Sequence, residues 1–80
     1  CDVAVVQLLS RAEGAVEEVV VTTTPDPLRS WVILTAPMPT TPRRYAVRCV
    51  SSAGAMVCTP WSRIVAPFSP TTVPLQLAAG

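Results

Sequence analysis

Short apolar segments alternate with proline-containing breaks along the whole chain. The nine prolines matter because proline interrupts both helices and the hydrogen-bond ladders of sheets. Most segments between them are rich in valine, threonine, isoleucine or aromatic residues, which favour the pleated strand. The segments are Val3–Ser10, Ala15–Thr24, Ser30–Ala36, Arg43–Ser51, Ala55–Thr59, Trp61–Ala66 and Thr72–Leu77. Short strands spaced about 8–12 residues apart are typical of a sandwich or a barrel.

This pattern predicts an all-β fold: a small immunoglobulin-like sandwich or partly open barrel of five to seven short, mainly antiparallel strands. The 80 residues are enough for one domain. We expect residues 1–66 to form the β domain. Residues 67–80 are expected to be a proline-containing C-terminal edge strand or arm, because Pro74 cannot donate to a central ladder.

The first apolar stretch has two interpretations. Six apolar residues fall at helical spacing, namely Val5, Leu8, Leu9, Ala12, Val16 and Val19. They permit an amphipathic helix from Asp2 to Glu18. The density of valine and the glycine at position 14 favour instead a hairpin that turns at Ala12–Gly14. The hairpin is the preferred interpretation, and the helix remains the alternative.

A second hairpin is predicted around Ala53-Gly54, since glycine supplies the positive φ that many tight turns need. A two-residue loop at these positions places Cys49 opposite Cys58, at a separation that permits a disulfide. The alternative is two buried free thiols. A disulfide would point to an oxidising compartment or a virion surface. Cys1 is left over as an odd cysteine.

Residues 45–65 resemble the last two strands of a fibronectin type III module. The resemblance rests on Tyr45-Ala46-Val47-Arg48-Cys49-Val50-Ser51-Ser52-Ala53-Gly54 and on Trp61-Ser62-Arg63-Ile64-Val65, about a quarter of the chain. It implies that Tyr45 is the core tyrosine of the penultimate strand, that Val47 and Cys49 point inward, and that Ile64 lies on the final strand. It carries over no ligand-binding residue, and the integrin-binding Arg-Gly-Asp is absent from the sequence.

The alternation within Arg43–Ser51 predicts which side chains are buried. Tyr45, Val47 and Cys49 should line the core, on the face opposite Arg44 and Arg48. We expect Trp31, Ile33 and Val57 to complete that core. Arg43, Arg44 and Arg48 are interpreted as a solvated strand face and not as a site for phosphate or nucleic acid.

Composition argues that part of the surface is covered by another protein. Half of the residues are hydrophobic and only 14% are charged, against roughly 25% in an ordinary soluble domain. So small a chain cannot hide that much apolar surface alone. We therefore expect a protein partner, either copies of this chain or a larger assembly. The interface candidates are Trp61, Phe68, Leu75 and Leu77.

The chain has few residues of the kinds that enzymes use for catalysis or for binding metals and cofactors. It has no histidine and no lysine, which removes the commonest general base, the commonest metal ligand and Schiff-base chemistry. Three cysteines without zinc-finger spacing and five dispersed carboxylates predict no metal site, no cofactor and no enzyme activity. A net charge of +1 predicts no nucleic-acid partner, and no apolar run reaches the roughly 18 residues of a membrane span.

Three hypotheses for function follow. The first is a non-catalytic structural module, a decoration or minor structural protein of a virion or phage shell. The second is an immunoglobulin- or fibronectin-like binding module of an extracellular or receptor protein. The third is a scaffold subunit of a larger enzyme or processed polyprotein. The first two place the chain on a virion surface or outside the cell.

Overall fold

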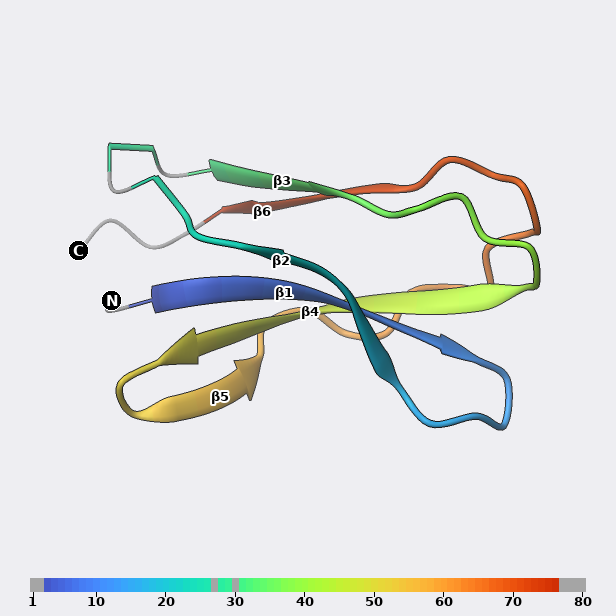
Figure 1. Ribbon diagram of the computed structural model, residues 1–80, viewed down its shortest axis with the longest axis horizontal. Helices are drawn as coiled ribbons and strands as arrows, with labels where there is room; N and C mark the ends of the chain where they lie inside the picture. The colour runs from blue at the N-terminus through green and yellow to red at the C-terminus, as the bar shows by residue number, and fades with distance from the viewer. Residues whose placement is uncertain (1–2, 27, 30, 77–80) are drawn as a thin grey trace.

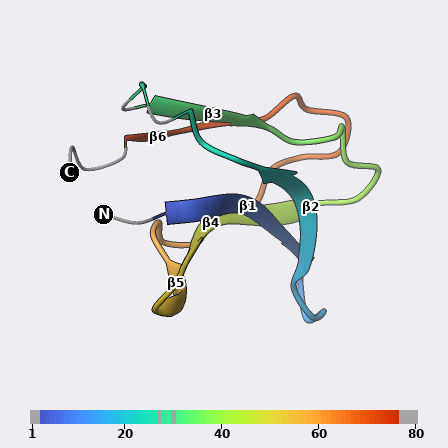
Figure 2. The same cartoon turned by 60° about the vertical axis from the view of Figure 1, so that its left-hand side comes forward.

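Two layers of antiparallel strands make up the protein, as the computed structural model shows for residues 3–26, 28–29 and 31–76. A four-stranded sheet has the order β2-β1-β4-β5, and a two-stranded sheet pairs β3 with β6. Figures 1 and 2 show the two-stranded sheet above the four-stranded one. The bounds of the strands are β1 Val3–Ala12, β2 Glu18–Thr23, β3 Trp31–Thr35, β4 Arg43–Ser51, β5 Gly54–Val57 and β6 Thr72–Gln76. The predicted all-β sandwich is therefore confirmed, with six strands in the described residues.

The first hairpin is the one that valine density and Gly14 predict. β1 turns back into β2 after Ala12, whose carbonyl accepts a hydrogen bond from the Ala15 amide (3.0 Å), and Gly14 has a φ of 76°. An L side chain rarely adopts that conformation, whereas glycine does so freely. The helix alternative for residues 2–18 is wrong over the described residues, because Val3–Ala12 is a strand.

The core lies between the sheets, where the inward side chains of β1 and β4 meet those of β3. Strand pairing sets Leu8 opposite Val47, and both are fully buried. The buried core cluster consists of Val6, Leu8, Val32, Leu34, Ala36, Tyr45 and Val47. The expected burial of Tyr45, Val47 and Cys49 is confirmed.

The predicted contribution of Trp31, Ile33 and Val57 to this core is wrong. On β3 the buried side chains are Val32 and Leu34, and Trp31 and Ile33 face outward. All four residues are apolar, so alternation defined two faces of the strand without defining which was inside. Val57 is exposed because β5 is an edge strand, and every residue of β5 is exposed.

The segment that follows β5 runs beside β4 without forming a regular strand, contrary to the strand expected at Trp61–Ala66. The Cys58 amide donates to the Val47 carbonyl (2.8 Å), the Ser62 amide to the Tyr45 carbonyl (2.8 Å), and Arg43 and Val65 exchange two bonds. Pro60 has no amide hydrogen, which prevents a continuous ladder here. Ile64, expected on a final strand, is half exposed beside this irregular path.

The second hairpin forms, but in a different register from the predicted one. Its turn residues are Ser52 and Ala53, so Cys49 faces Met56 and not Cys58. Gly54 has a φ of 122° and opens β5. Cys49 and Cys58 are both free thiols in this structure, the first buried and the second exposed.

Candidate protein-binding surface

The outer face of the two-stranded sheet is an uncharged surface that exposes two large apolar side chains. Strand pairing places Ile33 directly opposite Pro74 and places Trp31 opposite Gln76. Trp31 is 54% exposed and Ile33 is 67% exposed. Thr35 and Thr72 complete the set at the other end of the pair. None of these six outward residues carries a charge.

This face exists because the other faces of β3 and β6 are used for the core. Val32 and Leu34 of β3 are buried, and Val73 and Leu75 of β6 pack against the same cluster. Neighbouring residues on a strand point to opposite faces, so the intervening side chains must face outward. We call Trp31, Ile33, Thr35, Thr72, Pro74 and Gln76 the neutral face.

The four-stranded sheet presents a contrasting outer face that carries arginines. Arg48 donates two hydrogen bonds to Gln7 Oε1 (2.9 and 2.7 Å), and Arg44 forms an ion pair with Glu13 (3.2 Å). The Arg11 guanidinium lies 4.3 Å from the centre of the Trp61 ring, at a distance that permits a cation–π contact. These arginines are held by neighbouring side chains, as expected for a structural strand face.

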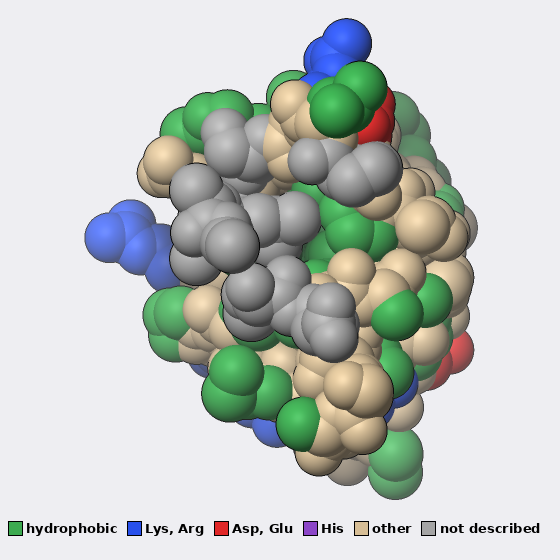
Figure 3. Space-filling model, turned by 90° about the vertical axis from the view of Figure 1, so that its left-hand side faces the viewer, with side chains coloured by type: hydrophobic (Ala, Val, Ile, Leu, Met, Phe, Trp, Pro, Cys, Tyr) green, Lys and Arg blue, Asp and Glu red, His purple; other side chains and the backbone are tan. Residues whose placement is uncertain are grey.

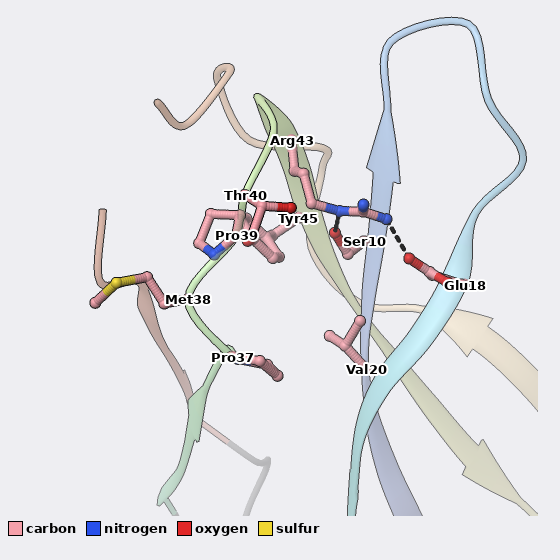
Figure 4. A pocket seen from close by; sticks show the side chains of 9 residues that line it. All are labelled: Ser10, Glu18, Val20, Pro37, Met38, Pro39, Thr40, Arg43 and Tyr45. Atoms are coloured by element: carbon pink, nitrogen blue, oxygen red, sulfur yellow. Dashed lines mark hydrogen bonds and ion pairs between the residues drawn. The ribbon is translucent and has the colours of Figure 1, made fainter. Parts of the chain in front are cut away.

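Arg43 closes one end of the sandwich beside a shallow hollow. Its Nε donates to the buried Ser10 Oγ (2.6 Å), and its Nη2 pairs with Glu18. Figure 4 shows this pair beside a cavity of about 190 Å³, which Val20 and Tyr45 also line. Pro37, Met38, Pro39 and Thr40 form the opposite wall. Because the guanidinium already has two partners, this hollow offers no free charge to a ligand.

Of the predicted interface residues, Trp61, Phe68 and Leu75 lie on different parts of the described structure. Trp61 is half-buried beside Arg11 on the outer side of the four-stranded sheet, and Leu75 points into the sandwich. Phe68 lies on a loop and is exposed, with a positive φ of 59°, and its amide donates to the Pro39 carbonyl (2.7 Å). Leu77 lies outside the described residues.

The neutral face was not predicted, because Trp31 and Ile33 were expected in the core. A signal was present: Trp31–Thr35 contains no charged residue, and neither does Thr72–Gln76. Strands that are apolar on both faces are either buried on both sides or meet another molecule.

The end of the molecule where β1 begins and β6 ends also exposes hydrophobic side chains. Figure 3 shows them at several places around that end, interspersed with polar atoms. The neutral face is distinguished from these scattered positions by regular strand geometry and by the absence of charge.

The described residues contain no group of three histidine, cysteine, aspartate or glutamate side chains placed to hold a metal ion. Within the same part of the chain, no helix is long and apolar enough to cross a membrane. No protein-family model, curated protein or solved structure matches the chain.

Proposed function

We propose that the chain is a non-catalytic structural module that associates with further copies of itself through the neutral face. The observation that carries this proposal is the outward placement of Trp31, Ile33 and Pro74 on one uncharged sheet surface. Tryptophan is among the residues that most often dominate binding energy at protein interfaces.

A second copy is the occupant that the charges favour. Two neutral faces can meet without like-charge repulsion and without leaving an unpaired charge buried, which would be costly. If the arginine-bearing face of another copy docked here instead, its arginines would lose water without gaining an opposite charge, which is unfavourable. Like surfaces that meet across a twofold axis are also the commonest arrangement in homo-oligomers.

The size of the neutral face indicates weak pairwise contacts. Two five-residue strands cover about 17 Å by 10 Å, or roughly 170 Å². A stable interface buries about 800 Å² on each partner. Contacts this small become effective when many copies are held side by side, because each later contact forms at high effective concentration. We propose that a larger assembly, the surface of a virion or phage shell, holds the copies side by side in this way.

Sedimentation equilibrium over a wide range of protein concentration tests the proposal. The average mass should rise with concentration for the wild type and remain that of a monomer for Ile33→Glu. Met56→Glu is the matched control, since Met56 is 66% exposed on the four-stranded sheet, and it should associate like the wild type. A wild type that stays monomeric throughout would overturn the proposal and favour the binding module of an extracellular protein.

A further inference from the structure

Cys49 and Cys58 are diagonal neighbours on the face of the four-stranded sheet that looks toward the core. Cys49 of β4 faces Met56, and Cys58 follows β5 with its amide bonded to the Val47 carbonyl (2.8 Å). Val47 and Cys49 share one face of β4 because they are two residues apart. Cys58, which is opposite Val47, therefore lies on the same face of the sheet as Cys49. Cys58 is close enough to contribute to the raised pKa of the Cys49 thiol.

The two thiols differ sharply in their access to solvent. Cys49 is buried, whereas Cys58 is exposed and its thiol donates to the Met56 carbonyl (3.5 Å). Burial, followed by the hydrogen bond and the charge of the neighbouring Cys58, raises the pKa of the Cys49 thiol to about 12. Cys49 therefore keeps its proton at neutral pH, and Cys58 is the thiol that an external reagent meets first.

The strand that connects the pair buries little of its surface. Diagonal Cα atoms in an antiparallel sheet lie about 7–8 Å apart, and a disulfide needs about 4.4–6.8 Å. β5 has four residues, lies at the edge of its sheet and exposes every side chain. A shift of about 1 Å toward Cys49 therefore disturbs little buried surface.

We infer that Cys49 and Cys58 are a redox-responsive pair, in which Cys58 captures a small-molecule disulfide and Cys49 then closes an internal disulfide. In the first step the Cys58 thiolate attacks one sulfur of the reagent, its S–S bond breaks, and one small thiolate leaves. In the second step Cys49 gives its proton to solvent and attacks the Cys58 sulfur, and the second small thiolate leaves. Two protein thiols are oxidised and one disulfide is reduced to two thiols. This inference is independent of the proposed self-association.

Capture of the reagent also removes the smaller of the influences that hold the proton on Cys49. Once Cys58 is bonded to the reagent, it can no longer carry a negative charge beside Cys49. Three influences raise the pKa of Cys49: its burial, the hydrogen bond with Cys58 and the charge of Cys58. The charge of Cys58 is lost in the adduct, whereas burial persists. The internal bond, when formed, fixes β5 to β4.

Oxidised glutathione is the probe, and Cys1→Ser is the background for every variant, so that the remaining cysteines are the pair itself. Folded protein is incubated with the probe, its free thiols are alkylated, and trypsin releases residues 49–63, which contain both cysteines. We expect this peptide to be unalkylated, lighter by two hydrogens and free of glutathione.

Two single variants separate the steps. Cys49→Ala should leave a stable glutathione adduct on Cys58. Cys58→Ala should react at Cys49 at least about ten-fold more slowly than Cys58 does in Cys49→Ala. Circular dichroism confirms that each variant is folded. A lasting glutathione adduct in the parent protein, or an internal bond that forms only in denaturant, would overturn the inference.

Discussion

At the scale of single residues, the centre of the four-stranded sheet is buried on both of its faces. Leu8 and Val47 point toward β3 and β6, whereas Leu9 and Ala46 point the other way and are also buried. The half-buried Trp61, which contacts Arg11 two residues along the strand from Leu9, lies on that second side. A module of 80 residues thus gains apolar burial on two sides of one strand pair.

Leu8→Ala should lower the free energy of unfolding by about 2–5 kcal/mol, because it leaves a cavity in a fully buried site. Urea denaturation followed by circular dichroism measures the change. Val16→Ala is the control, since Val16 is 88% exposed, and it should change stability by less than about 0.5 kcal/mol. Equal losses for both variants would contradict the assignment of the core.

Cys49 should make stability depend on pH in the alkaline range. Its folded-state pKa is raised from 9.0 to about 12, so the folded state holds this proton more tightly than the unfolded state does. The resulting stabilisation is complete below about pH 9 and is lost as pH rises toward 12. Cys49→Ala lacks this titrating thiol. The difference in free energy of unfolding between wild type and variant should therefore shrink as pH rises from about 9 toward 12. A constant difference would show that Cys49 titrates normally.

Residue patterns predicted burial well on β4 and poorly on β3, for one physical reason. On β4 the polar Arg44 and Arg48 mark the outer face, so Tyr45 and Val47 had to be inside. On β3 both faces are apolar, and only packing against β1 and β4 decides which face is buried. The absence of charge on β3 indicated that both of its faces need cover, but it did not indicate that the face with Trp31 and Ile33 is the outer one.

At the scale of elements, the path from Cys58 to Val65 shows how an irregular segment protects one edge of β4. Two hydroxyl groups replace backbone acceptors: Thr59 Oγ1 accepts the Val47 amide (2.9 Å) and Ser62 Oγ accepts the Tyr45 amide (3.0 Å). Each would otherwise be a donor without a partner next to the core, which is costly. Side chains thus continue the ladder where Pro60 interrupts the backbone pattern.

Thr59→Val and Ser62→Ala should each lower stability by about 1 kcal/mol or more, because each removes an acceptor for an amide of a buried residue. The hydroxyl of Thr41 lies on an exposed loop, so Thr41→Ala serves as the control. Chemical denaturation gives the magnitudes, and hydrogen exchange should be faster at the Val47 and Tyr45 amides. Unchanged exchange at these amides would contradict the role of the hydroxyls.

The elements themselves were largely predictable, and their exact pairing was not. Gly14 located the first turn correctly, since no other residue there tolerates the required φ so well. Ala53-Gly54 located the second turn only to within one residue. That shift was enough to replace Cys58 by Met56 as the partner of Cys49. Weak turn residues and an exposed edge strand leave the register loosely specified by sequence.

At the scale of the whole molecule, the two outer faces of the sandwich differ in chemistry. One carries Arg44 and Arg48 with their partners on β1 and its turn, and the other is the neutral face. An asymmetric module of this kind can turn one face to solvent and the other to a neighbouring copy. This division accounts for a low content of charge without requiring a larger core.

The most direct test of self-association through the neutral face is to record amide chemical shifts by NMR as the protein concentration is raised. Shifts that depend on concentration should concentrate on Trp31–Thr35 and Thr72–Gln76, and they should disappear in Ile33→Glu. The amides of Arg44–Arg48 should stay constant and serve as the internal reference. Shifts confined to the four-stranded sheet, or no dependence on concentration, would contradict self-association through the neutral face.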